Sequence, residues 1–195
     1  MNQKSMDDDL LDVLGLGDDE DEVFVDADNR RILIEGEITQ KIVQQAVMPL
    51  ISMDSDGTGE PIEIFIHSLG GSALDGLVLC DVIDRLKTHT TIIVLGYAFS
   101  MGCIILSAGK HNPNVHKVCY PFSVGLLHDG SSNFAGSVGD VKDTYKFYNK
   151  IDTKIKKYIL HNTNITEKEY NAMERKQWYM DANTMLKYGL VDEIL

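Results

Sequence analysis

The sequence predicts one α/β domain with a largely parallel sheet. Segments rich in β-branched and other apolar residues alternate with segments of helical periodicity, which is typical of this fold class. The 195 residues include 44% hydrophobic and 25% charged side chains, as in ordinary globular proteins. The run 91–95 is almost continuously apolar, which indicates a strand covered on both faces.

The predicted elements follow in order from Arg31. β-Branched and aromatic residues mark the strands, apolar residues at helical spacing mark the helices, and glycine or polar clusters mark the turns between them. The first half reads as strand 32–34, helix 43–51, loop 54–61, strand 62–66, glycine turn 68–72, helix 74–86 and strand 91–95. The second half reads as a helical run to 108, strands 118–120 and 124–127, a long helix over about 138–160, a helix from 166 with a capping box, the segment 178–180, and a last helix and strand through 195.

The acidity is concentrated at the N-terminus. Residues 1–28 contain 11 Asp or Glu and one Lys, a net charge of −10, so the remaining 167 residues carry only −2 of the total −12. We expect 1–28 to be a flexible acidic tail and 29–195 to be the folded domain. The sequence shows no basic patch of the kind that would indicate nucleic-acid binding.

The sequence also favours a cytoplasmic protein. The first residues lack the pattern of a signal peptide, and the most apolar stretch, 98–109, is shorter than the roughly 20 residues of a membrane span. The three cysteines Cys80, Cys103 and Cys119 show no CxxC or metal-ligand spacing and are interpreted as small buried apolar residues. No metal site is expected.

Ser100 is the candidate nucleophile. It lies between an apolar strand and a helical run, and a serine on such a turn exposes its hydroxyl beside free backbone N–H groups. The same position also suits a plain helix N-cap. Two other segments fit the chemistry, each with a structural alternative: Gly70-Gly71, which could direct N–H groups at an oxygen or form a simple turn, and His128, which could be a base or a structural residue.

Together these segments resemble a known family. S-L-G-G-S (68–72), A-F-S-M-G-C (98–103), L-L-H (126–128) and Y-G-L-V-D-E-I-L (188–195) are similar to motifs of the proteolytic subunit of the ATP-dependent Clp protease. That family carries S/T-P-G-G-S, A-S-M-G, I-H-Q-P and Y-G-L-V/I-D in this order. The resemblance runs from about Arg30 to Leu195.

The resemblance implies a serine endopeptidase that uses no cofactor. Ser100 would attack the peptide carbonyl after His128 takes its proton, and the N–H groups of Gly71 and Met101 would hold the oxyanion. Counting back from the terminal motif, the family's triad aspartate falls on Gln177, which can accept a hydrogen bond but carries no charge. Asp181 and Glu174 are nearby carboxylates that could substitute.

The resemblance also implies an architecture and partners. The fold would be the spiral of ββα units shared with crotonases, with a protruding helix after His128 that interlocks subunits. Two seven-membered rings would stack and enclose the active sites, and a ring-shaped ATP-driven unfoldase would supply unfolded chains. This sequence has no Walker A motif, so the partner would bind ATP. The acidic tail lies where the family has its axial gate, and we expect it to modify substrate entry or the choice of partner.

Two further departures from the family motifs are Leu69 in place of proline, a minor change, and Asp129-Gly130 in place of Q-P, which would loosen the strand that pairs with substrate. Gln177 is also consistent with an alternative interpretation, in which the chain is an inactive structural subunit that assembles with an active paralogue. The remaining alternatives are a crotonase-type acyl-CoA enzyme, which the Ser100 and His128 motifs disfavour, and a phage prohead-type processing protease.

Overall fold

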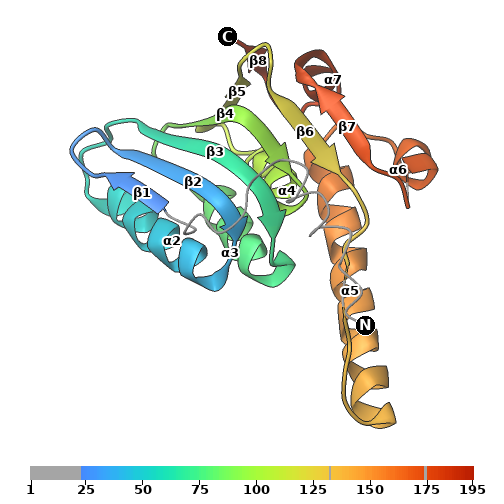
Figure 1. Cartoon of the computed structure of the whole chain (residues 1–195). Helices are drawn as coiled ribbons and strands as arrows, with labels where there is room; N and C mark the ends of the chain where they lie inside the picture. Colours follow the sequence, from blue (N-terminus) through green and yellow to red (C-terminus); the bar gives the residue numbers. More distant parts are fainter. Residues whose placement is uncertain (1–22, 132, 174) are drawn as a thin grey trace.

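The computed structural model describes residues 23–131, 133–173 and 175–195. Within these residues an eight-stranded sheet runs in the order β1-β2-β3-β4-β5-β8, and β6 leaves this path to pair with β4 and β7. Helices α2, α3 and α4 lie against one face of the sheet, and α5 extends away from the body (Figure 1). Most pairs are parallel; β1 with β2 and β6 with β7 are the antiparallel pairs among them.

The strands are β1 (Val23–Asp26), β2 (Arg31–Ile38), β3 (Ile62–Gly71), β4 (Thr90–Phe99), β5 (Val115–Cys119), β6 (Val124–Leu127), β7 (Trp178–Asp181) and β8 (Glu193–Ile194). The helices are α2 (Gln40–Ser55), α3 (Ala73–Ile83), α4 (Met101–Ser107), α5 (Val138–Asn162), α6 (Glu167–Met173) and α7 (Ala182–Lys187). From β2 onward the predicted order of elements is therefore confirmed, and the segment 178–180, to which no type was assigned, lies in strand β7.

Two boundaries differ from the sequence analysis. Residues 23–26, assigned there to the acidic tail, form β1, because Val23 and Val25 pack against the core while the strand pairs with β2. Residues 1–22, the rest of that tail, lie outside the described residues. The predicted glycine turn is also different: 68–71 continue β3 beside β2, with a register shift between Gly36 and Glu37, and the chain turns only at Ser72, whose side chain caps α3.

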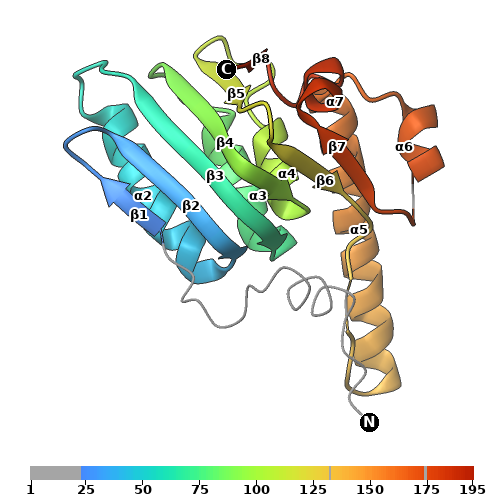
Figure 2. The ribbon, with the colours of Figure 1, turned by 45° about the horizontal axis from the view of Figure 1, so that its top comes forward.

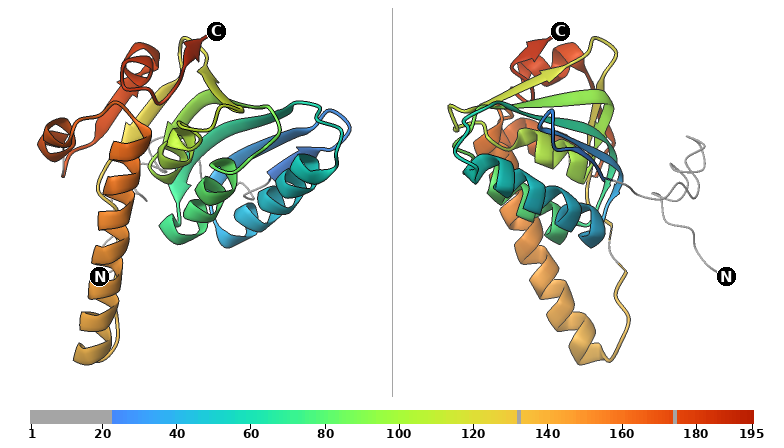
Figure 3. Two further views of the ribbon diagram at one scale, coloured as in Figure 1. Left: turned by 180° about the vertical axis from the view of Figure 1, so that it is seen from behind. Right: turned by 90° about the vertical axis from the view of Figure 1, so that its left-hand side faces the viewer.

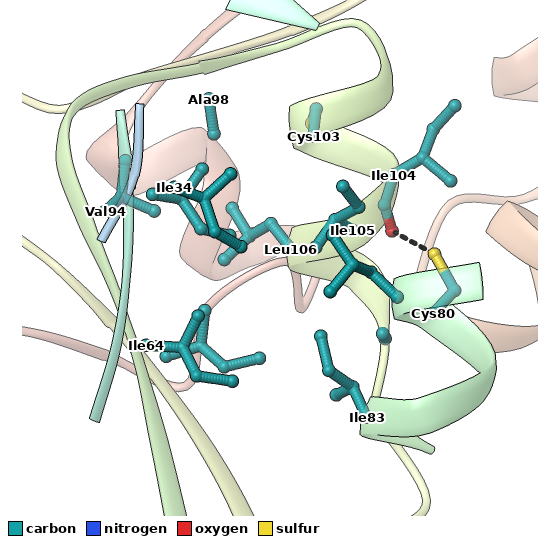
Figure 4. Close-up of a cluster of buried hydrophobic side chains, with 14 of the residues drawn as sticks. Ile34, Ile64, Cys80, Ile83, Val94, Ala98, Cys103, Ile104, Ile105 and Leu106 are labelled. Atoms are coloured by element: carbon teal, nitrogen blue, oxygen red, sulfur yellow. Dashed lines mark hydrogen bonds between the residues drawn. The ribbon is translucent and has the colours of Figure 1, made fainter. Parts of the chain in front are cut away.

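The core lies between the sheet and helices α2, α3 and α4. Isoleucines of β2 and β3, such as Ile34 and Ile64, meet Ile105 of α4, and all three are at most 1% exposed (Figure 4). The cysteines are confirmed as buried, unpaired residues. Burial raises the pKa of the Cys103 thiol to about 12 and that of Cys119 to about 11, so neither is a reactive thiolate.

Helix α5 is predominantly solvent-exposed. Ser137 and Asp140 form a capping box at its start, and its buried residues are Ile151, Ile159 and Asn162, all in its second half. Tyr158 fixes that half to the body by donating a 2.8 Å hydrogen bond to Asp84 Oδ2. The first half stands clear of the sheet in every view (Figures 1–3). No helix in the described ranges is both long enough and apolar enough to cross a bilayer.

Lys117 is buried beside the C-terminal motif. Its side chain is 1% exposed, and its Nζ donates a 3.2 Å hydrogen bond to the carbonyl of Gly189. Burial lowers the pKa of Lys117 to about 8, although the Asp192 carboxylate opposes this shift. Asp192 also accepts the backbone N–H of Lys117 at 2.9 Å, so the Y-G-L-V-D segment ties the C-terminus to β5.

We expect Lys117→Met to abolish one component of the pH dependence of stability. The unfolded chain holds the lysine proton up to about pH 10.4, whereas the folded protein releases it near pH 8. The unfolded state therefore binds more protons between these values, and the free energy of unfolding of the native protein should rise with pH by up to about 3 kcal/mol relative to the variant. Urea unfolding at pH 7.5, 8.5 and 9.5 measures this. A constant difference between the two proteins would contradict it.

Candidate active site

Ser100 occupies a strained turn between β4 and α4. Its backbone has φ 50° and ψ −119°, a conformation that residues with a side chain rarely adopt. It is the N-cap residue of α4, but its side chain makes no capping hydrogen bond. The Ser100 N–H instead donates a 2.8 Å bond to the carbonyl of Leu126 in β6. The hydroxyl is therefore not used to cap the helix, and the strain resembles that of a nucleophile elbow.

Gly70 makes the tight approach to Ser100 possible. Its φ is 97°, and a Cβ on Gly70 would lie 2.5 Å from Ser100 Cβ and 2.8 Å from the backbone nitrogen of Met101. The Oγ of Ser68 holds this glycine in place by accepting its N–H at 3.1 Å. Sequence analysis noted the glycine pair but gave a role only to Gly71; the close approach of Gly70 to Ser100 comes from the structure.

The two candidate oxyanion donors lie at the ends of neighbouring elements. Gly71 is the last residue of β3, and Met101 is the first residue of α4, which follows β4. Gly71 also requires a glycine, because at φ 143° a Cβ would lie 2.6 Å from the carbonyl oxygen of Ile38. Since β3 and β4 are parallel neighbours, both donors lie at one edge of the sheet.

His128 leaves the sheet at the same edge. It directly follows β6, which pairs in parallel with β4 through Phe99 and Leu126. Ser100 and His128 therefore follow the carboxyl ends of two adjacent strands, β4 and β6. Figure 2 shows these two strands side by side. His128 is half-buried.

The third position is defined by the pairing of β6 and β7. Leu127 pairs with Trp178, so continuing this antiparallel register by one residue places Gln177 opposite His128. Asp181 pairs with Val124 at the far end of β6, and its Oδ1 accepts the N–H of Thr184 at 2.8 Å to cap α7. Hydrogen bonds from the side chain and then from the backbone N–H of Thr184 lower the pKa of Asp181. Asp181 is thus engaged away from His128, and Glu174 lies outside the described residues.

Among the described residues, no group of three or more histidines, cysteines, aspartates or glutamates is arranged to hold a metal ion. The arrangement of Ser100, His128 and two N–H donors at one sheet edge is instead suited to nucleophilic attack on a carbonyl.

Comparison with known proteins agrees with this chemistry. The family model described as Clp protease matches residues 20–195. The chain is 29% identical over 168 residues to the ATP-dependent Clp protease proteolytic subunit of Deinococcus radiodurans, covering 86% of this chain and 80% of the relative. It is 28% identical over 169 residues to the protein of the same name from Streptococcus mutans, covering 86% and 85%.

The Gly70 contact can be tested against a glycine with a similar backbone and open surroundings. Gly57 has φ 77° and nothing within 4 Å of a built Cβ. We expect Gly57→Ala to cost about 1 kcal/mol from its backbone alone, and Gly70→Ala to cost about 3 kcal/mol or more because Ser100 must also move. Chemical unfolding compares the two. Equal losses would show that the crowding of Gly70 against Ser100 is unimportant.

Proposed function

The chain belongs to the Clp protease family, and from that premise we propose that it is a serine peptidase subunit in which Ser100 is the nucleophile and His128 its base. The observation that carries this assignment is the strained Ser100 turn, whose N–H bonds to β6, the strand that His128 directly follows. A serine that served only to cap α4 would have no need of this strain.

The reaction follows from the groups at the sheet edge. Ser100 Oγ forms a bond to the peptide carbonyl carbon while His128 accepts the hydroxyl proton, and the N–H groups of Gly71 and Met101 stabilise the negative carbonyl oxygen. The C–N bond then breaks, and the imidazolium returns the proton to the leaving amine. Water hydrolyses the resulting ester by the same steps, with His128 again as base.

Gln177 fits the role of the group that orients His128. Its amide oxygen can accept the Nδ1–H of the imidazole and so select the tautomer that presents Nε2 to the serine. It lacks the negative charge that would stabilise the imidazolium, so we expect a slower enzyme than one with an aspartate at this position.

The assembly is proposed from the exposed first half of α5. Val138, Tyr145 and Phe147 are 74%, 54% and 48% exposed on a helix that stands clear of the body. Apolar side chains in such a position favour coverage by a second copy, and we infer the two stacked seven-membered rings that the family resemblance implies. Because the chain has no Walker A motif, an ATP-driven Clp unfoldase is the partner we expect to deliver unfolded substrates.

The central test is covalent labelling. The purified full-length protein is incubated with a fluorophosphonate, and the adduct is located by mass spectrometry. We expect modification of Ser100 that is lost in Ser100→Ala and strongly reduced in His128→Ala, because the hydroxyl needs its base. A folded protein that assembles normally but is never labelled would contradict the peptidase assignment and favour a structural subunit.

Replacing the neutral third residue provides a second test. Gln177→Asp should raise kcat for a fluorogenic peptide by about tenfold or more, because a carboxylate stabilises the imidazolium in the transition state. Asp181→Ala is the matched control: it removes the α7 cap and should lower the thermal midpoint while leaving kcat nearly unchanged. A loss of activity in Asp181→Ala, with none gained in Gln177→Asp, would identify Asp181 as the acid instead.

A further inference from the structure

Strand β7 directly follows Gln177 and is attached to the sheet through one neighbour. It has four residues and, within the described sheet, pairs with β6 and no other strand. Gln177 itself precedes the strand and is exposed. Because β7 is an edge strand, its hydrogen bonds to β6 alone allow it to twist relative to the rest of the sheet. A further contact is needed to hold Gln177 in a constant position relative to Ser100.

An aromatic contact crosses β6 and supplies this link. Phe99 of β4 pairs with Leu126 of β6, which in turn pairs with Tyr179 of β7, so the three residues form one row. Strands two apart are separated by about 10 Å, yet the rings of Phe99 and Tyr179 approach to 5.9 Å between centroids, edge to face at 83°. Phe99 is 7% exposed and Leu126 1%, whereas Tyr179 is half-exposed.

This row lies next to the candidate catalytic residues in each strand. Phe99 immediately precedes Ser100, Leu126 is two residues before His128, and Tyr179 is two residues after Gln177. Because side chains alternate with a period of two, His128 and Gln177 share the sheet face of this row. The ring pair therefore joins the strand of the nucleophile directly to the strand of the third residue.

We propose that Tyr179 is a positioning residue that acts through Gln177. Its ring, packed on Phe99, fixes β7 against β4 and so holds the Gln177 amide where it can accept the His128 N–H. The inference rests on the proposed peptidase function. A carboxylate attracts an imidazolium over several directions, whereas a neutral amide depends on the alignment of one hydrogen bond. Misplacement by about 1 Å can cost a hundredfold in rate.

The first test separates positioning from substrate binding. Tyr179→Leu removes the ring and keeps apolar volume, and we expect kcat for a fluorogenic peptide to fall about tenfold with KM changed by less than about twofold. Tyr179→Phe keeps the ring and should retain the native kcat. Tyr97→Leu is the matched control, since Tyr97 also contacts Phe99, at 5.0 Å, but lies in β4 itself, and its ring contacts among the described residues are with His67 and Phe99 and not with β7.

The second test uses coupling between the two positions. If Tyr179 acts through Gln177, Tyr179→Leu should reduce kcat in the native background but have little further effect in Gln177→Ala. Equal, multiplicative losses in both backgrounds would overturn the proposal, as would a raised KM with unchanged kcat, which would make Tyr179 a substrate contact. Circular dichroism and gel filtration check that each variant is folded and assembled; should Tyr179→Leu fail either check, the same cycle is run with Tyr179→Met.

Native protein that neither hydrolyses the peptide nor labels at Ser100 would refute the proposed function. Active native protein with an equally active Tyr179→Leu variant would refute this inference alone.

Discussion

Strand β4 changes its partner halfway along, and the geometry of the candidate site depends on that change. Its first half, Thr90–Val94, pairs with β5, and its last residues, 97–99, pair with β6. Gly96, at φ 73°, lies between the two halves, where the register with β3 also shifts. Because β6 replaces β5 beside the end of β4, His128, which follows β6, lies at the same end of the sheet as Ser100. The bond from the Ser100 N–H to Leu126 fixes this junction.

The proposed third residue belongs to the same junction. If Gln177 orients His128 as proposed, a neutral amide stands where a charge would act, and the orientation of His128 depends on packing more than on electrostatics. Phe99 and Tyr179 are large rings in the row immediately behind the three candidate residues. Lys117, in the middle of β5, also depends on short-range contacts: burial disfavours its charge, and the carbonyl of Gly189 accepts a hydrogen bond from its amine.

Local patterns were sufficient for much of the fold. The period-two strands, the helical spacings and the capping box at Thr166 predicted the element order, because these signals arise from residues within one or two turns of each other. The glycine segment was misjudged as a turn. Glycines are usual in turns, but here Gly70 and Gly71 allow a strand to pass close to Ser100 and to Ile38, which no local pattern reveals. β1 was missed for a similar reason: it needs β2 to pair with.

The sequence by itself determined the α/β class, the candidate nucleophile and base, and Gln177 as the residue aligned with the family's third position, since each depends on residue type and spacing. Only the tertiary structure decided which neighbours these residues have. The β6–β7 pairing places Asp181 beside Val124, at the opposite end of β6 from His128, and the strained backbone separated Ser100 from an ordinary helix cap. Both facts depend on pairing between segments far apart in the chain, and the energy of such pairing is not encoded in either segment alone.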